Sequence, residues 1–255
     1  MRKTALVLSG GALFGAYQAG AWRFLETVFQ PDLVVGTSVG ALNGWCIAGG
    51  VPADAIASHW MEPRTAQLLL RRTRALPLTG VFDRSELERR TMELTASVRP
   101  RIPFALTAVQ LAGLESRIFE DREVTWRHMV ASCAVPGGFA PVRIDGRLYI
   151  DGGFVNSLPI WAAVRLGATR VIAINALALA PSRVLKGVAR GIGWISRNRK
   201  PANTGAEVLR IQPEQPLGTL ADATRWNPET IRGWIERGES DARRAWLAAQ
   251  ASAAA

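Results

Sequence analysis

The chain alternates short apolar runs with segments of helical periodicity. The runs that predict buried strands are 5–8, 33–35, 104–111, 116–119, 148–150, 170–175 and 207–211. Apolar residues at helical spacing predict a first helix through Ala19, Trp22, Leu25, Val28 and Phe29, closed by Pro31. Further helices are predicted over 125–132 and from Asn227 onwards, and 52–100 reads as a helix with an irregular basic stretch.

This alternation indicates an α/β fold. Strands separated by helices favour a three-layer α/β/α arrangement around a mostly parallel central sheet. The 255 residues suffice for one ordinary domain, and no segment rich in Pro, Gly or Ser divides them. Residues 1–250 are therefore predicted to form a single domain, with 251–255 as a frayed Ala-rich tail.

The strand predicted at 33–35 runs into Gly36-Thr37-Ser38-Val39-Gly40. A strand that ends in Gly-x-Ser-x-Gly has to turn sharply into the next helix, and the turn pushes the serine hydroxyl out of the sheet. Gly36 and Gly40 let the two backbones cross without a Cβ clash. Ser38 is thus the candidate nucleophile, although a Gly/Ser turn without chemistry fits the same five residues.

A nucleophilic serine needs a base, and histidine is the usual one. The chain has only His59 and His128, and no histidine follows Asp151 as the order of an α/β-hydrolase triad requires. Asp151 can act as the base itself, because it follows a predicted strand and Gly152 and Gly153 allow another group to come close. The same Asp-Gly sequence is also common in plain turns.

A glycine-rich loop, Gly10-Gly11-Ala12, connects the first predicted strand to the first helix. Successive backbone N–H groups in such a loop can bind an anion, which in acyl transfer is the oxyanion of the tetrahedral intermediate. A dinucleotide loop is the competing interpretation, because the loop continues to Gly15 and Asp32 follows at a suitable distance. Asp32 precedes its strand instead of ending it, which disfavours dinucleotide binding.

Composition narrows the expected partners. The formal charge of +10 favours an anionic partner, and the segment from Arg183 to Lys200 combines six basic residues with Trp194 and Ile195 and has no acidic residue. This segment is predicted to touch an anionic membrane peripherally, the alternative being an ordinary helix with a basic rim. No nucleic-acid motif and no metal-type Cys/His spacing occurs, so neither nucleic acid, metal nor cofactor is expected.

Features of the chain also bear on location. Cys46 and Cys133 lie in small apolar contexts and are expected to be buried thiols in a reducing compartment. The N-terminal residues lead directly into a strand without a signal-peptide pattern, and no apolar run approaches the length of a membrane span. These features predict a cytoplasmic protein, in contact with a membrane only peripherally, and leave the oligomeric state open.

Three blocks resemble, in order and spacing, those of the patatin-like phospholipases. They are Leu8 to Gly20 around the glycine-rich loop, Gly36 to Ala41 around Ser38, and Ala131 to Pro136 with Asp151-Gly152-Gly153, and they cover the chain to about Ala176. The resemblance implies a serine lipid acyl hydrolase of phospholipase A, lysophospholipase or esterase type. Its nucleophile would be Ser38, its base Asp151, and its oxyanion hole Gly10, Gly11 and Ala12, so that no histidine is needed.

Two positions depart from the pattern of that family. Ala12 replaces the third glycine of the loop, and Phe14 stands where Arg or Lys is usual. Backbone donation at residue 12 survives a change from Gly to Ala if φ is negative there, whereas the absent cation bears on the binding of a phospholipid headgroup. The alternative function is therefore a catalytically weak or inactive relative that binds fatty acid or lipid.

Overall fold

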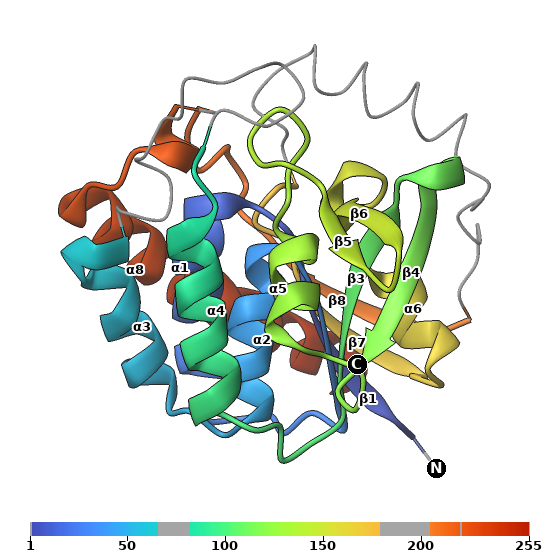
Figure 1. The fold of residues 1–255 in the computed structure, drawn as a ribbon. Coiled ribbons are helices and arrows are strands. Elements are labelled where there is room, and N and C mark those ends of the chain that lie inside the picture. The colour runs from blue at the N-terminus through green and yellow to red at the C-terminus, as the bar shows by residue number, and fades with distance from the viewer. Residues whose placement is uncertain (1, 66–81, 179–204, 220, 255) are drawn as a thin grey trace.

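The apolar runs form one eight-stranded sheet in the computed structural model, which describes residues 2–65, 82–178, 205–219 and 221–254 (Figure 1). The strands are β1 (Thr4–Leu8), β2 (Leu33–Thr37), β3 (Phe104–Gln110), β4 (Glu115–Glu120), β5 (Val142–Ile144), β6 (Arg147–Asp151), β7 (Arg170–Ile174) and β8 (Glu207–Ile211). Their order is β5-β6-β3-β2-β1-β7-β8, and β4 also pairs with β3. β1, β2, β3, β7 and β8 run parallel, which confirms the mostly parallel sheet.

Helices cover both faces of this sheet. They are α1 (Gly15–Leu25), α2 (Val39–Ala48), α3 (Ala53–Met61), α4 (Ser85–Ser97), α5 (Trp126–Ser132), α6 (Ile160–Arg165) and α8 (Pro228–Ala254). Along β1, Leu6 and Leu8 enter the core beneath α1, α2 and α8, whereas Ala5 and Val7 point to the opposite face, where α6 packs. The alternation of side chains along a strand thus produces the three layers that the sequence predicted.

Several element boundaries differ from the prediction. α1 ends at Leu25, and Val28, which was assigned to this helix, lies 42% exposed in the turn that follows. β5 and α6 were not predicted, because each is shorter than the windows in which periodicity can be recognised. α8 continues to Ala254, past the predicted boundary at 250, as the high helix propensity of alanine favours. The basic segment 183–200 lies outside the described residues.

α1 and α8 cross in backbone contact. A Cβ added to Gly20 would lie 1.9 Å from the carbonyl oxygen of Ile235, and one added to Gly238 would lie 2.0 Å from that of Tyr17. Next to the crossing, the Tyr17 hydroxyl donates a hydrogen bond of 2.9 Å to Asp241, and burial together with the Asp241 charge raises the pKa of Tyr17. α8 therefore holds the helix that follows the glycine-rich loop. None of the described helices combines the length and apolar composition that crossing a bilayer requires.

Candidate active site

Ser38 lies at a strained turn between β2 and α2. Its φ of +56° and ψ of −130° are unfavourable for a residue with a side chain. The backbones on the two sides of this turn approach so closely that neither glycine could carry a side chain. A Cβ on Gly36 would lie 2.2 Å from the Gly40 carbonyl oxygen, and a Cβ on Gly40 would lie 2.5 Å from the Leu8 carbonyl oxygen. The pentapeptide thus forms the sharp strand-to-helix turn that its sequence predicted.

A second serine anchors this turn. The backbone N–H of Ser38 donates a hydrogen bond of 2.8 Å to Oγ of Ser132, at the end of α5, and Ser132 Oγ donates in turn to the Thr107 carbonyl oxygen at 2.8 Å. Ser132 is fully buried and stands 94 residues from Ser38 in the sequence. The strained turn is therefore tied to the central strand β3 as well as to its own flanking elements.

The register of β3 brings Asp151 to Ser38. β2 pairs with the first half of β3 and ends with Thr37 opposite Thr107, whereas β6 pairs with the second half and ends with Asp151 opposite Ala108. Because β4 occupies the other edge of β3 over residues 105–110, β2 and β6 share one edge and meet end to end. Asp151 thus ends an antiparallel strand that points back at the end of β2.

The Asp151 carboxyl group is buried, with 3% of the residue exposed. Its Oδ1 accepts a hydrogen bond of 2.6 Å from the Gly153 N–H, and its own N–H donates to the Ala134 carbonyl oxygen at 3.0 Å. Burial raises the pKa of Asp151 from 3.8 to about 7, although hydrogen bonds from the Ser38 side chain and from Gly153 act in the opposite direction. The carboxyl therefore exchanges its proton near neutral pH and interacts with the Ser38 hydroxyl.

Cys133 completes the surroundings of the Ser38 hydroxyl. Burial and the neighbouring Asp151 charge raise the pKa of this thiol, and a hydrogen bond with the Ser38 side chain lowers it by a smaller amount. The sequence predicted a buried thiol here, which the structure confirms, but gave no sign that it lies beside Ser38. Cys46 is half-buried on α2, and both cysteines are free.

The histidines and Asp32 have structural partners. His128 caps α5, its ring accepting from the Thr125 N–H, and burial lowers its pKa. His59 is exposed on α3. Asp32 accepts a hydrogen bond of 2.8 Å from the Thr4 N–H at the amino end of β1. Ser38 lies at the other end of the parallel strands, after the carboxyl end of β2. This position gives Asp32 a role in joining β1 to β2 and places it away from the glycine-rich loop.

The glycine-rich loop lies against the nucleophile, since a Cβ on Gly10 would come within 3.3 Å of the Ser38 Cβ. The Gly10 N–H donates to the Ser157 carbonyl oxygen at 2.9 Å. The N–H groups of Gly11 and Ala12 have no hydrogen-bond partner among the described residues. The φ of Ala12 is +49°, so the negative φ that would make alanine equivalent to glycine there is not observed. Within the described part of the chain, Gly11 and Ala12 are therefore the loop N–H groups that no protein acceptor engages.

A buried polar network supports this loop from behind. Gln18 Nε2 donates to the Ser9 carbonyl oxygen at 2.6 Å, and Ser9 Oγ donates to that of Gly10 at 2.9 Å. Asn43 of α2 donates to Gln18 Oε1 at 3.0 Å and accepts from the Trp60 indole of α3 at 3.1 Å. Three helices are therefore connected to the loop through hydrogen bonds that the sequence did not reveal.

The packing of Phe14 accounts for the absence of Arg or Lys at this position. The ring is buried and packs edge-on against Trp234 of α8, with the ring centroids 4.9 Å apart. A charged side chain could not replace it without losing its hydration. Position 14 therefore serves the contact between the glycine-rich loop and α8.

Comparisons with known proteins agree with this geometry. A family model described as patatin-like phospholipase matches residues 6–164. Neuropathy target esterase sws of Drosophila melanogaster is 30% identical over 67% of the chain, and human patatin-like phospholipase domain-containing protein 6 is 31% identical over 67%. The chain spans 12% and 13% of these relatives. The fold resembles that of VipD from Legionella pneumophila, with a TM-score of 0.58 at 13% identity, covering 96% of this chain and 66% of VipD.

Proposed function

The chain belongs to the patatin-like phospholipase family, and from this premise we propose that it is a serine lipid acyl hydrolase. It cleaves carboxylic esters, with Ser38 as nucleophile and Asp151 as base. One observation carries the proposal above the others. A serine on a strained turn at the end of β2 faces the end of β6, which carries a buried carboxyl whose pKa burial raises to about 7. This pKa suits a group that takes up and returns a proton near neutral pH.

The reaction proceeds in two halves. Ser38 Oγ attacks the ester carbonyl carbon while its proton passes to the Asp151 carboxylate, and the carbonyl π electrons move to the oxygen. Collapse of this intermediate expels the alcohol, which takes the proton back from Asp151. Water then attacks the acyl-serine, gives its proton to Asp151, and the acid leaves as Oγ is reprotonated. No group other than water and the ester is consumed.

The oxyanion formed in each half needs donors close to Ser38. The sequence proposed Gly10, Gly11 and Ala12 for this role, and the Gly10 N–H is already engaged by Ser157. We assign the role to the N–H groups of Gly11 and Ala12. A well-placed donor of this kind contributes about 3–4 kcal/mol to the stability of the transition state.

Labelling with a fluorophosphonate tests the nucleophile. Wild type should react at Ser38, Ser38→Ala should not, and Ser252→Ala, which removes an exposed serine near the end of α8, should label like wild type. Equal labelling of wild type and Ser38→Ala would exclude a serine hydrolase. Asp151→Asn should abolish turnover of a short-chain nitrophenyl ester, and retained turnover would move the role of base to another residue.

The second candidate is a relative that binds fatty acid without turnover. The observation that favours it is Ala12, because the positive φ of this residue costs an alanine about 1 kcal/mol or more in the loop that would hold the oxyanion. An assay with a short-chain and a long-chain ester separates the two candidates. Absence of turnover on both, with retained binding of a fatty acid, would favour the second.

We also propose a membrane contact and a cellular location for the protein, both from its sequence. Segment 183–200 is proposed to bind anionic lipid peripherally. Co-sedimentation with anionic and neutral vesicles at low and high salt tests this, and binding that ignores both lipid charge and salt would contradict it. The two free cysteines support a cytoplasmic location, which cell fractionation tests.

A further inference from the structure

A groove with a volume of about 380 Å³ lies between α2, α3 and α4, on the side of α2 away from the sheet. Its walls are mostly apolar, and several of the side chains are only half-buried. The apolar lining consists of Leu42 and Cys46 from α2, Val51, Ala55, Ile56 and Trp60 from α3 and the turn before it, and Leu87, Leu94 and Val98 from α4 and its end. Binding of an apolar ligand to such a groove is favourable, because the ligand displaces water from apolar surface.

The lining of the groove begins on α2, one helical turn after the nucleophile. α2 starts directly after Ser38, and Leu42 and Cys46 follow one and two turns further along the same helix. Leu42 and Leu87 pack in one cluster with Cys133, and Cys133 lies close enough to the Ser38 side chain for the two to interact. Apolar side chains of α2 and of this cluster therefore lie between the Ser38 turn and the groove.

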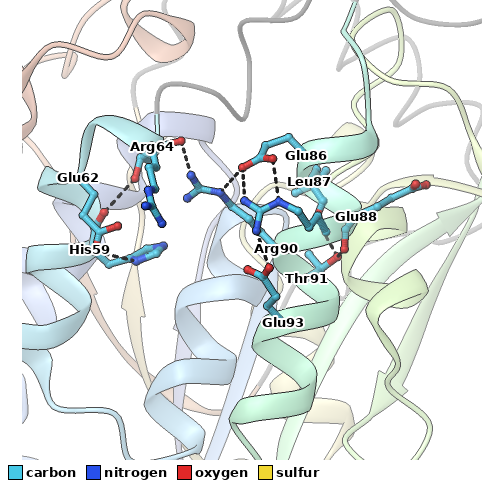
Figure 2. A network of polar contacts seen from close by, with 11 residues as sticks. His59, Glu62, Arg64, Glu86, Leu87, Glu88, Arg90, Thr91 and Glu93 are labelled. Atoms are coloured by element: carbon cyan, nitrogen blue, oxygen red, sulfur yellow. Dashed lines mark hydrogen bonds and ion pairs between the residues drawn. The ribbon is translucent and has the colours of Figure 1, made fainter.

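Several charged residues also line the groove, and Figure 2 shows most of them paired with one another. Arg90 donates to Glu86 at 2.9 Å and also to the Arg64 carbonyl oxygen, while Arg89 bonds Glu86 and Glu93. The hydrogen bond from Arg90 to the Arg64 carbonyl oxygen joins α4 to the segment that follows α3. This bond helps to set the spacing between the two helices. Because Glu86, Arg89, Arg90 and Glu93 are paired within the protein, the apolar lining suits an uncharged acyl chain, whereas the guanidinium of Arg64, which also lines the groove, has no ion-pair partner among the described residues.

We propose that this groove holds the acyl chain of the ester cleaved at Ser38, an inference that rests on the proposed function. With a rise of 1.5 Å per residue, Cys46 stands about 12 Å along α2 from Ser38. A dodecanoyl chain reaches this level and a butyryl chain does not. The groove thus assigns the protein a preference for medium and long acyl chains.

The first experiment blocks the groove from a surface position. Ala55 is an exposed residue of α3 that lines the groove, whereas Ser58 is exposed on the same helix and does not line it. Each buried methylene adds roughly fourfold in binding, so Ala55→Trp should lower kcat/KM for a dodecanoate nitrophenyl ester by about tenfold or more. The same variant should change kcat/KM for the butyrate ester by less than about twofold, and Ser58→Trp should match wild type on both esters.

The second experiment measures binding without chemistry. In the Ser38→Ala background, displacement of a fluorescent fatty acid by dodecanoate should weaken about tenfold when Ala55→Trp is added, and should not change with Ser58→Trp. Cys46→Phe, which fills the floor of the groove, provides a second blocking variant, and circular dichroism verifies that each variant is folded.

The outcomes separate the two proposals. If butyrate and dodecanoate esters are cleaved and Ala55→Trp keeps the wild-type preference, the acyl groove is excluded and the hydrolase stands. If no ester is cleaved but Ala55→Trp weakens the binding of dodecanoate, the hydrolase fails and the groove stands as a fatty-acid site. Unchanged binding in both blocking variants would overturn the groove whatever the activity.

Discussion

Replacing Asp151 by Asn removes a buried carboxylate while keeping an oxygen that accepts the Gly153 N–H. Burial raises the pKa of Asp151 from 3.8 to about 7, so the folded protein holds this proton more tightly than the unfolded chain does. The stability contributed by the group is therefore present at low pH and lost as the pH rises from about 4 to about 7. Once ionised, the buried carboxylate lowers the free energy of unfolding by about 4 kcal/mol relative to its protonated form.

Urea denaturation of wild type and Asp151→Asn at about pH 5 and about pH 8 measures this cost. The variant carries no ionisable group at this position, so the free energy of unfolding of Asp151→Asn relative to wild type should rise by about 2–3 kcal/mol between the two conditions. Turnover should move in the opposite sense, since wild-type activity rises through about pH 7 as Asp151 ionises, while Asp151→Asn stays inactive throughout.

Asp222 supplies a control with the opposite sign. Hydrogen bonds from Thr219 lower the pKa of this exposed carboxyl, so its contribution is present at neutral pH and is lost in acid. Asp222→Asn should therefore lose stability relative to wild type as the pH rises from strong acid to above 3.8, the ordinary pKa of the group, and its stability difference from wild type should stay constant between about pH 5 and about pH 8. A stability difference for Asp151→Asn that stays constant from about pH 5 to about pH 8 would refute the argument that burial shifts the pKa of Asp151.

Three further changes test the supports of the site. Gln18→Leu removes the bond to the loop carbonyl and should lower kcat about tenfold with little change in KM, because loop geometry matters most in the transition state; an equal rise in KM would contradict this. Ala12→Gly relieves a positive φ and should stabilise the protein by about 1 kcal/mol in thermal unfolding, whereas the same change at the exposed, helical Ala96 should cost about as much. Gly238→Ala places a Cβ against the α1 backbone and should destabilise in urea by several kcal/mol, while Gly233→Ala, with open space around it, should be neutral or stabilising by up to about 1 kcal/mol.

The sequence predicted those elements whose signals are local. A buried strand such as β1 or β7 is a short apolar run, and the pentapeptide around Ser38 forces its turn through the sterics of neighbouring residues. Asn227 likewise marks the start of α8, because its side chain accepts from the N–H groups of Glu229 and Thr230. In each case the residues that determine the structure stand within a few positions of one another.

The contacts between distant segments gave no such signal. Ser132 was noted only as part of a block, although its hydroxyl holds the Ser38 N–H. The engagement of the Gly10 N–H by Ser157 and the bond from Gln18 to Ser9 depend on how the sheet assembles. Asp151 was expected only at the end of a strand, and the sequence did not indicate that this strand, β6, pairs antiparallel with β3 and so meets β2 end to end. Such pairings follow from topology, which single-sequence patterns do not encode.

The backbone crossing of α1 and α8 has a consequence for how the protein acquires its structure during synthesis. α8 lies beyond residues 6–164, the region that the family model matches. The hydrogen bond beside the crossing joins Tyr17 to Asp241 over 224 residues. A contact of such long range forms late in folding. Ser38 and the glycine-rich loop therefore leave the ribosome before α8 has been synthesised, and the crossing that packs α8 against α1 can form only after Gly238 has emerged.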